Sequence, residues 1–171
     1  MKFLLIPLSL VLLLTGCATT VVSVDRAVEE IAWNTIDMIP EGVKPVIAVY
    51  NLRDMTSNGE VNKLLVARLT TQLANAAREE ERDIIIVSRQ VFNEVFQEHA
   101  FILSDLSEEK QQLEIGKLLG ADLILTGDLT RTEGDLFNVN TQLVDIESGK
   151  VIGGDTFEFW INMPDGESHS P

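Results

Sequence analysis

The sequence contains few of the side chains on which most catalytic and metal sites depend. Its 171 residues include one cysteine, Cys17, and two histidines, His99 and His169. A lone cysteine excludes an internal disulfide, so a hydrophobic core must hold the fold together. The sequence also lacks a G-x-S-x-G motif, a phosphate-binding loop and a dinucleotide-binding fingerprint. We therefore predict a protein with no catalytic site, no metal and no cofactor.

Basic side chains are scarce as well. The chain has 13 Lys and Arg against 27 Asp and Glu, a formal net charge of −14. Nucleic-acid binding rests on neutralising phosphates with basic side chains, so we exclude nucleic acid as a partner. An anionic membrane surface would repel such an acidic chain, and attachment to a membrane would need another source.

Residues 1–16 have the layout of an export signal. Lys2 precedes a mainly apolar run over residues 3–14, and the small residues Thr15 and Gly16 follow it. The run is too short to cross a membrane, because a spanning helix needs about 20 apolar residues. We therefore predict that residues 1–16 are removed on export.

The end of this signal also predicts a lipid anchor. Leu14, Thr15, Gly16 and Cys17 resemble the lipobox of bacterial lipoproteins, in which a diacylglyceryl group is attached to the cysteine before cleavage. The alternative is an ordinary secretory peptide in which Cys17 is a small core residue. The position of Cys17 at the end of the apolar run favours lipid attachment. The rest of the chain divides into a lipidated N-terminus with a short spacer (17–23), a single α/β domain (24–163) and a polar tail (164–171).

Three β-branched runs in the domain predict buried strands. They lie at residues 45–50, 84–87 and 123–127, and helical patterns separate them. Because helical crossovers join parallel neighbours, these three strands should pair in parallel. We expect Asp25 to cap the first helix and Gly120 to end the last one.

After the third run the pattern changes to alternating apolar and polar residues. Short turn sequences at 133–135 and 147–150 predict hairpins and therefore antiparallel strands. Gly153 and Gly154 interrupt the final strand and predict a β-bulge. The expected fold class is α/β, with a mixed sheet of three parallel strands joined by helical crossovers, a C-terminal antiparallel hairpin extension, and helices packed on the sheet.

The final strand offers a candidate contact surface for a partner. If residues 156–161 form a sheet edge, Trp160 and Glu158 share one of its faces, away from Phe157 and Phe159. The alternative is that Trp160 lies under a neighbouring helix. An exposed edge would also allow a homo-oligomer.

The many Asp and Glu side chains leave one enzymatic function as an alternative to a binding role. Glu94 and Asp128 could act as acids on envelope glycan, because the two acids of a glycosidase meet in space and not in the sequence. Neither residue belongs to a recognisable motif, so we rank a glycan hydrolase below a binding protein.

Several segments resemble the CsgG/LpoB/FlgO-like family of bacterial outer-membrane lipoproteins. They are the strand at 46–49, residues 86–89 with the short helix after them, residues 115–127 (IGKLLGADLILTG) and residues 143–151 (LVDIESGKV). The likeness covers about residues 44–161. It implies a non-catalytic α/β domain that faces the periplasm and binds an envelope protein.

The resemblance also implies a location and a role. Ala18 is not Asp, the residue associated with inner-membrane retention, so we favour the outer membrane, with lipid on Cys17 as the anchor. The spacer of six residues is too short to carry the domain across the periplasm, as the tether of a peptidoglycan-synthase activator would. We therefore favour the FlgO layout and a role in assembling or stabilising a flagellar or secretion structure. Activation of a peptidoglycan synthase is the alternative.

Overall fold

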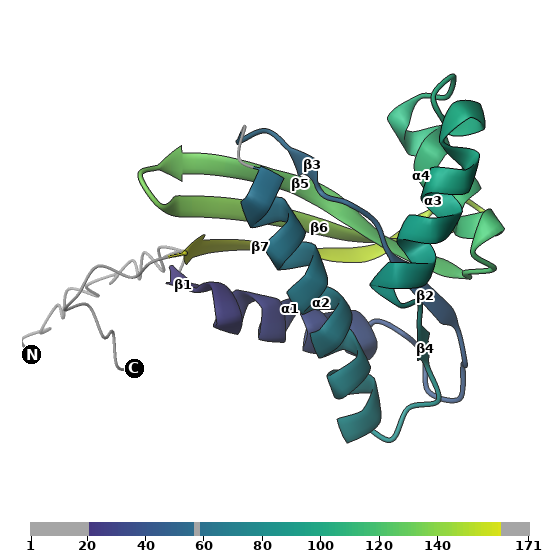
Figure 1. Ribbon diagram of the computed structural model, residues 1–171. Coiled ribbons are helices and arrows are strands. Elements are labelled where there is room, and N and C mark those ends of the chain that lie inside the picture. The colour runs from purple at the N-terminus through teal and green to yellow at the C-terminus, as the bar shows by residue number, and fades with distance from the viewer. Residues whose placement is uncertain (1–20, 57–58, 162–171) are drawn as a thin grey trace, which may run out of the picture.

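The computed structural model describes residues 21–56 and 59–161. The lipobox with Cys17, His169 and the tail from 164 to 171 lie outside these residues, so the predictions made for them stay predictions. The described part of the chain forms one mixed sheet with helices packed on it (Figure 1). None of the helices in this part has the length and apolar character that a membrane span requires.

The sheet combines parallel and antiparallel neighbours, as the sequence predicts. Its strands are β1 (Val22–Ser23), β2 (Val46–Val49), β3 (Arg53–Asp54), β4 (Ile85–Ile86), β5 (Leu123–Glu133), β6 (Leu136–Asp145) and β7 (Val151–Trp160). They follow the order β1-β7-β6-β5-β2-β4, and β3 pairs with β5. β2 is parallel to both β4 and β5, whereas β5, β6 and β7 pair in antiparallel fashion. The predicted fold class is confirmed.

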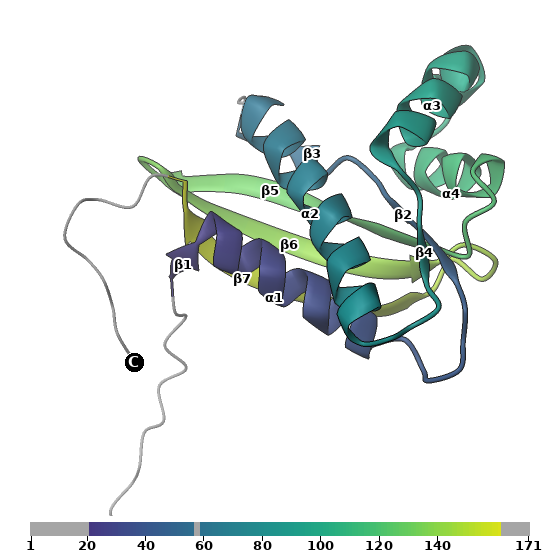
Figure 2. The ribbon, with the colours of Figure 1, turned by 60° about the horizontal axis from the view of Figure 1, so that its bottom comes forward.

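Two pairs of helices cover the sheet. They are α1 (Val24–Asp37) with α2 (Gly59–Glu79), and α3 (Arg89–Leu103) with α4 (Glu108–Leu118). α1 and α2 lie side by side against one face, as Figure 2 shows, and enclose the larger core. α3 and α4 gather at the β2 end of the sheet and enclose a smaller core with β2 and β5. The chain therefore has two cores on one sheet.

The larger core joins α1 and α2 to the antiparallel strands. Leu65, Leu69 and Leu73 recur every four residues on α2 and are fully buried. Phe137 on β6 faces Phe159 on β7, and their rings stack with centroids 5.9 Å apart. Burying a phenylalanine contributes roughly 1.5–3 kcal/mol, so this pair helps hold the hairpin strands in register.

The smaller core fixes one side of α3. Tyr50, which follows β2, meets Phe92 and Phe96 edge-on, with ring centroids 5.8 Å and 6.5 Å away. Leu103, at the end of the helix, is buried with them. At about 3.6 residues per turn, Phe92, Phe96 and Leu103 lie along one side of α3, and this side packs into the smaller core.

The chain enters the sheet earlier than the sequence pattern indicates. β1, whose residues were assigned to the spacer, pairs in parallel with Phe159 and Trp160 of β7. Ser23, and not Asp25, is the N-cap of α1, because its hydroxyl accepts a hydrogen bond from the backbone N–H of Arg26 at 3.3 Å. Asp25 lies in the first turn, where a carboxylate is stabilised by the helix dipole.

β4 differs from the strand that its sequence predicts. The run at 84–87 indicated a strand buried on both faces, but β4 has only two residues and lies at the edge of the sheet. The Ile85 side chain is 58% exposed. A short run of β-branched residues has the same pattern in a central strand and in an edge strand, so the pattern alone did not place β4.

Glycines end α4 and shape the hairpins where the sequence predicts. Gly120 has a φ of +64° directly after α4, and Gly134 has a φ of +50° in the turn between β5 and β6. The register of β6 and β7 shifts between Leu143 and Val144, beside Gly153. The predicted bulge is therefore present.

Candidate functional site

The helices leave one face of the antiparallel strands open. α1 and α2 cover the face that carries Phe137 and Phe159, and alternate residues of each strand point to the opposite side. We call this opposite side the open face. Its members are Thr130, Asn138 and Glu158; Asp128, Asn140 and Thr156; and Leu136 and Trp160, each group lying across neighbouring strands. All eight are partly or fully exposed, so the open face is a polar surface with an apolar end.

Trp160 and Glu158, the predicted partner contact, both lie on the open face. Trp160 is opposite Leu136, and Glu158 is opposite Asn138 on β6. Both side chains are partly exposed. The prediction that they share a face is confirmed by this register, whereas contact with a partner stays a prediction.

The sheet edge predicted at residues 156–161 is covered at its end. β1 pairs with Phe159 and Trp160, so the backbone of this part of β7 already has a neighbour on both sides. Sequence alone could not show this, because a strand of two residues has no period to detect. Trp160 is therefore available from the face of the sheet and not from its edge.

An ion pair joins the open face to α4. The Nε atom of Arg53 lies 2.7 Å from Oδ1 of Asp128, and its Nη1 lies 4.0 Å from Oε2 of Glu108 in the first turn of α4. These groups are partly exposed, so each pair contributes at most about 1 kcal/mol. Burial raises the pKa of Tyr50 behind them, and Glu108 adds to that rise. Arg53 thus places a cation beside the carboxylate of Asp128 on the open face.

The candidate acids have separate surroundings. Glu94 lies on the exposed side of α3 and is hydrogen-bonded within its own helix, whereas Asp128 is paired with Arg53 on the sheet. His99 has its Nδ1 3.0 Å from the backbone oxygen of Val95, also within α3. Within residues 21–56 and 59–161, no group of three or more His, Cys, Asp or Glu side chains is placed to hold a metal ion.

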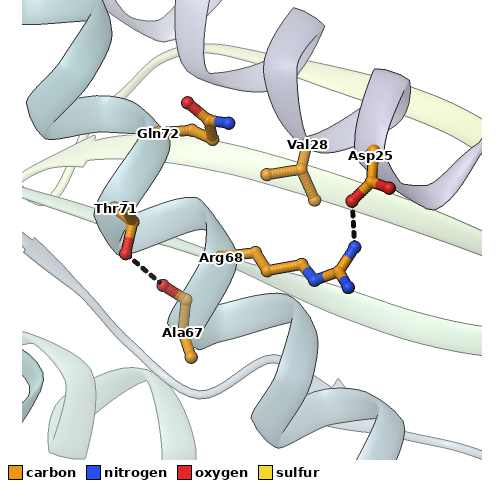
Figure 3. Close-up of a pocket in the computed structure, with 6 residues that line it drawn as sticks. All are labelled: Asp25, Val28, Ala67, Arg68, Thr71 and Gln72. Carbon is orange, nitrogen blue, oxygen red and sulfur yellow. Dashed lines mark hydrogen bonds and ion pairs between the residues drawn. The ribbon is translucent and has the colours of Figure 1, made fainter.

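A shallow groove of about 280 Å³ lies between α1 and α2 (Figure 3). An ion pair between Asp25 and Arg68 crosses it, and the Thr71 hydroxyl donates to the backbone oxygen of Ala67 within α2. Small-molecule sites usually occupy about 300–1,000 Å³ and have mainly apolar walls. We interpret the groove as the seam between two packed helices.

Asp155 is a partly buried carboxylate that the sequence reasoning missed. Its Oδ1 accepts a hydrogen bond from Nδ2 of Asn34 at 3.0 Å, and its Oδ2 is buried without a partner among the described residues. Burial raises the pKa of Asp155, the bond from Asn34 opposes the rise, and Glu30 adds to it. Asp155 shares the inward side of β7 with Phe157 and Phe159, so the two-residue period of this strand could have identified it.

α3 carries a second feature that sequence reasoning missed. Phe101 is 86% exposed and Ile102 is 63% exposed. Large apolar side chains on a helix normally predict packing, and the pattern contains no signal that marks these two as unused by the core.

The comparisons with known proteins identify the family. The family model of the peptidoglycan-synthase activator LpoB matches residues 24–155. The chain belongs to the LpoB family. No curated protein matches the sequence.

Solved LpoB structures have a similar fold. The C-terminal domain of LpoB from Salmonella enterica is 18% identical, with a TM-score of 0.55, and the match covers 79% of this chain and 96% of that one. The NMR structure of LpoB from E. coli is 15% identical, with a TM-score of 0.59, over 92% of this chain and 79% of that one. The lipoprotein GNA1162 from Neisseria meningitidis is 16% identical, with a TM-score of 0.52, over 73% and 86%. At such identities the likeness shows the fold alone.

The family match also corrects the preference expressed from the sequence. The sequence resembles a family that includes CsgG, LpoB and FlgO, and the short spacer favoured the FlgO layout. No comparison supports FlgO or CsgG. That preference rested on the length of the spacer, which lies outside the domain. The match instead follows residues 24–155, which contain all four helices and most of the sheet.

Proposed function

We propose that this protein is a lipid-anchored activator of a peptidoglycan synthase. The observation that carries the proposal is the match of residues 24–155 to the family model of the peptidoglycan-synthase activator LpoB. The shared fold with the C-terminal domain of LpoB supports it. In this role the domain binds a synthase of the penicillin-binding-protein class and acts through protein contacts, without a reaction of its own.

The anchor in this proposal is lipid on Cys17. Residues 1–16 and the lipobox support export and lipidation, and Ala18 in place of Asp supports the outer membrane with the domain facing the periplasm. A single acyl chain gives only marginal membrane binding, whereas a diacylglyceryl group supplies two chains and holds almost permanently. The domain would therefore stay on its membrane through many cycles of partner binding.

The short spacer restricts where activation takes place. β1 begins at Val22, five residues after Cys17, so the anchor lies within about 18 Å of the sheet at roughly 3.6 Å per residue. A tether of this length cannot cross the periplasm. The synthase must therefore extend its own docking part to the outer-membrane side.

The direct test is a synthesis assay with the full lipidated chain in detergent. A purified bifunctional peptidoglycan synthase from the same organism is supplied with lipid-linked precursor, and glycan polymerisation and peptide crosslinking are followed separately. The chain should accelerate at least one of the two reactions several-fold. Unchanged rates at saturating concentrations would contradict the proposal. Capture of flagellar or secretion proteins by crosslinking in intact cells would instead favour the role in a flagellar or secretion structure that the sequence suggested.

A digestion assay separates activation from hydrolysis. A glycan hydrolase would digest isolated peptidoglycan without any synthase, and Glu94→Gln or Asp128→Asn would abolish the digestion. An activator leaves the glycan intact, and neither substitution creates or removes a hydrolytic product. The predicted partner contact at Trp160 and Glu158 has its own test, because loss of synthase binding in Trp160→Ala would place the contact on the open face.

A further inference from the structure

α3 turns large apolar side chains toward solvent on the side that the smaller core does not use. Phe101 is 86% exposed, Ile102 is 63% exposed and Val91 is 47% exposed. Phe92 and Phe96, which contact Tyr50 in the core, point to the other side of the helix. The fold is therefore complete without Phe101 and Ile102.

Two of these side chains are neighbours in the last turn of the helix. Phe101 directly precedes Ile102, whereas Val91 lies about three helical turns away, on the same side of α3 as Ile102. We call Phe101 and Ile102 the α3 patch. Single exposed apolar residues are common on protein surfaces, but grouped ones that include a phenylalanine mark contact sites.

Two acidic side chains precede Phe101 and Ile102 on α3. Glu94 and Glu98 are exposed and lie along the helix between Val91 and Ile102. From residue 89 to residue 118, six acidic residues stand against three basic ones. A partner that covers the patch must bring basic side chains around an apolar pocket, because like charges would oppose docking.

α3 lies at the opposite end of the domain from the predicted anchor. β1 and β4 lie at opposite ends of the strand order, five strand spacings or about 24 Å apart, and β4 leads directly into α3. Figure 1 shows β1 and α3 at opposite ends of the molecule. With Cys17 held within about 18 Å of β1, the anchored end of the domain lies opposite the end that carries α3.

We infer that the α3 patch is the surface that docks the peptidoglycan synthase, through a basic region of the synthase that has a pocket for Phe101. The inference rests on the proposed function and adds the place of contact and the chemistry of the partner. The helix supplies apolar anchors and the carboxylates of Glu94 and Glu98 supply the charge. Phe101 and Ile102 account for most of the affinity, and the carboxylates speed association.

The test measures binding of the full lipidated chain in detergent to the purified synthase by surface plasmon resonance. The Phe101→Ser, Ile102→Ser double variant should raise the Kd at least tenfold with no change in the thermal unfolding midpoint, since both side chains are mostly exposed. Met55→Ser is the matched control, because Met55 is 64% exposed but follows β3, away from α3. It should bind as the wild type does.

Charge gives an independent readout on the same instrument. The Glu94→Lys, Glu98→Lys double variant should slow association several-fold, and added NaCl should weaken wild-type binding more than it weakens binding of this variant. A structural role of the helix would not produce this salt dependence.

The other possible outcomes contradict either the docking inference alone or the proposed function as well. If the wild type binds and the Phe101/Ile102 variant binds equally well, the α3 patch is not the docking surface while the proposed function stands. Loss of binding in Trp160→Ala alone would also overturn the inference and move the contact to the open face. If the wild type neither binds nor activates the synthase, the proposed function fails, and the docking inference fails with it.

Discussion

If lipid on Cys17 anchors the domain as proposed, the short connection between Cys17 and β1 predicts which residues lie nearer the membrane. Asp135 lies in the turn between β5 and β6, and its backbone oxygen accepts a hydrogen bond from the N–H of Ile161. Val22 on β1 is opposite Phe159, two residues before Ile161. Two strand spacings across the sheet and two residues along it place Asp135 about 12 Å from Val22. Gln97 is an exposed residue of α3, which packs near β2 toward the opposite edge of the sheet, and that edge is about 24 Å from β1. Asp135 should therefore lie closer to the lipid headgroups than Gln97.

Cysteine labelling measures this order, because lipidation of the sole native cysteine leaves no other thiol to react. Asp135→Cys and Gln97→Cys are each labelled with a small fluorophore and reconstituted in vesicles that carry headgroup-attached quenchers. The label at Asp135 should be quenched several-fold more than the label at Gln97. The Asp135 substitution removes only an exposed ion pair with Arg131, worth at most about 1 kcal/mol, so the fold is preserved.

A longer tether is the control. Inserting 20 Gly and Ser residues after Thr20 gives an average reach of about 25 Å and should remove the difference between the two labels. Equal quenching with the native tether, or stronger quenching at Gln97, would refute the orientation and with it the argument that α3 faces the periplasm.

Three further predictions concern the domain and its anchor. Because the pKa of Asp155 is raised in the folded state, its contribution to stability is present at low pH and is lost as the pH rises through the folded-state pKa. The free energy of unfolding of Asp155→Asn, measured in urea, should therefore be higher relative to the wild type at pH 7.5 than at pH 4. An equal difference at both pH values would contradict this prediction. Gly127→Ala should destabilise by about 1–3 kcal/mol, because its Cβ would lie 2.0 Å from the backbone oxygen of Asn140; Gly59→Ala, which meets no atom within 4 Å, is the control for the same urea titration. Cys17→Ser should yield unprocessed, unlipidated protein by mass spectrometry, and normal maturation of this variant would remove the proposed anchor.

The parallel direction of the central strands could be predicted because their signals are local and repeated, whereas their order in the sheet was not predicted. β-branched runs separated by helical patterns admit few arrangements, and helical crossovers fix the parallel pairing of β2, β4 and β5. The turn sequences around Gly134 and Gly149 likewise fix the hairpins, since both glycines adopt positive φ. In each case the residues that form an element also carry its signal.

Other features depend on neighbours that are distant in the sequence. Ser23 and Val22 form a strand only because the end of β7 offers a free edge. Phe101 is exposed because a different side of α3 packs against Tyr50. The spacing of apolar residues along a helix does not show which of its apolar sides will pack into the core. The open face was predicted in part, since alternation placed Trp160 with Glu158, but the Arg53 ion pair with Asp128 required the position of β3.

The pairing of β1 with β7 also decides where a pulling force on the N-terminus enters the domain. Such a force reaches the described residues at Val22, a buried residue paired with Phe159, and not at the end of a loose helix. In the proposed role, tension between the lipid anchor and a bound synthase would be borne by the sheet from one edge to the other. This arrangement would let the domain stay folded while the membrane and the synthase move relative to each other.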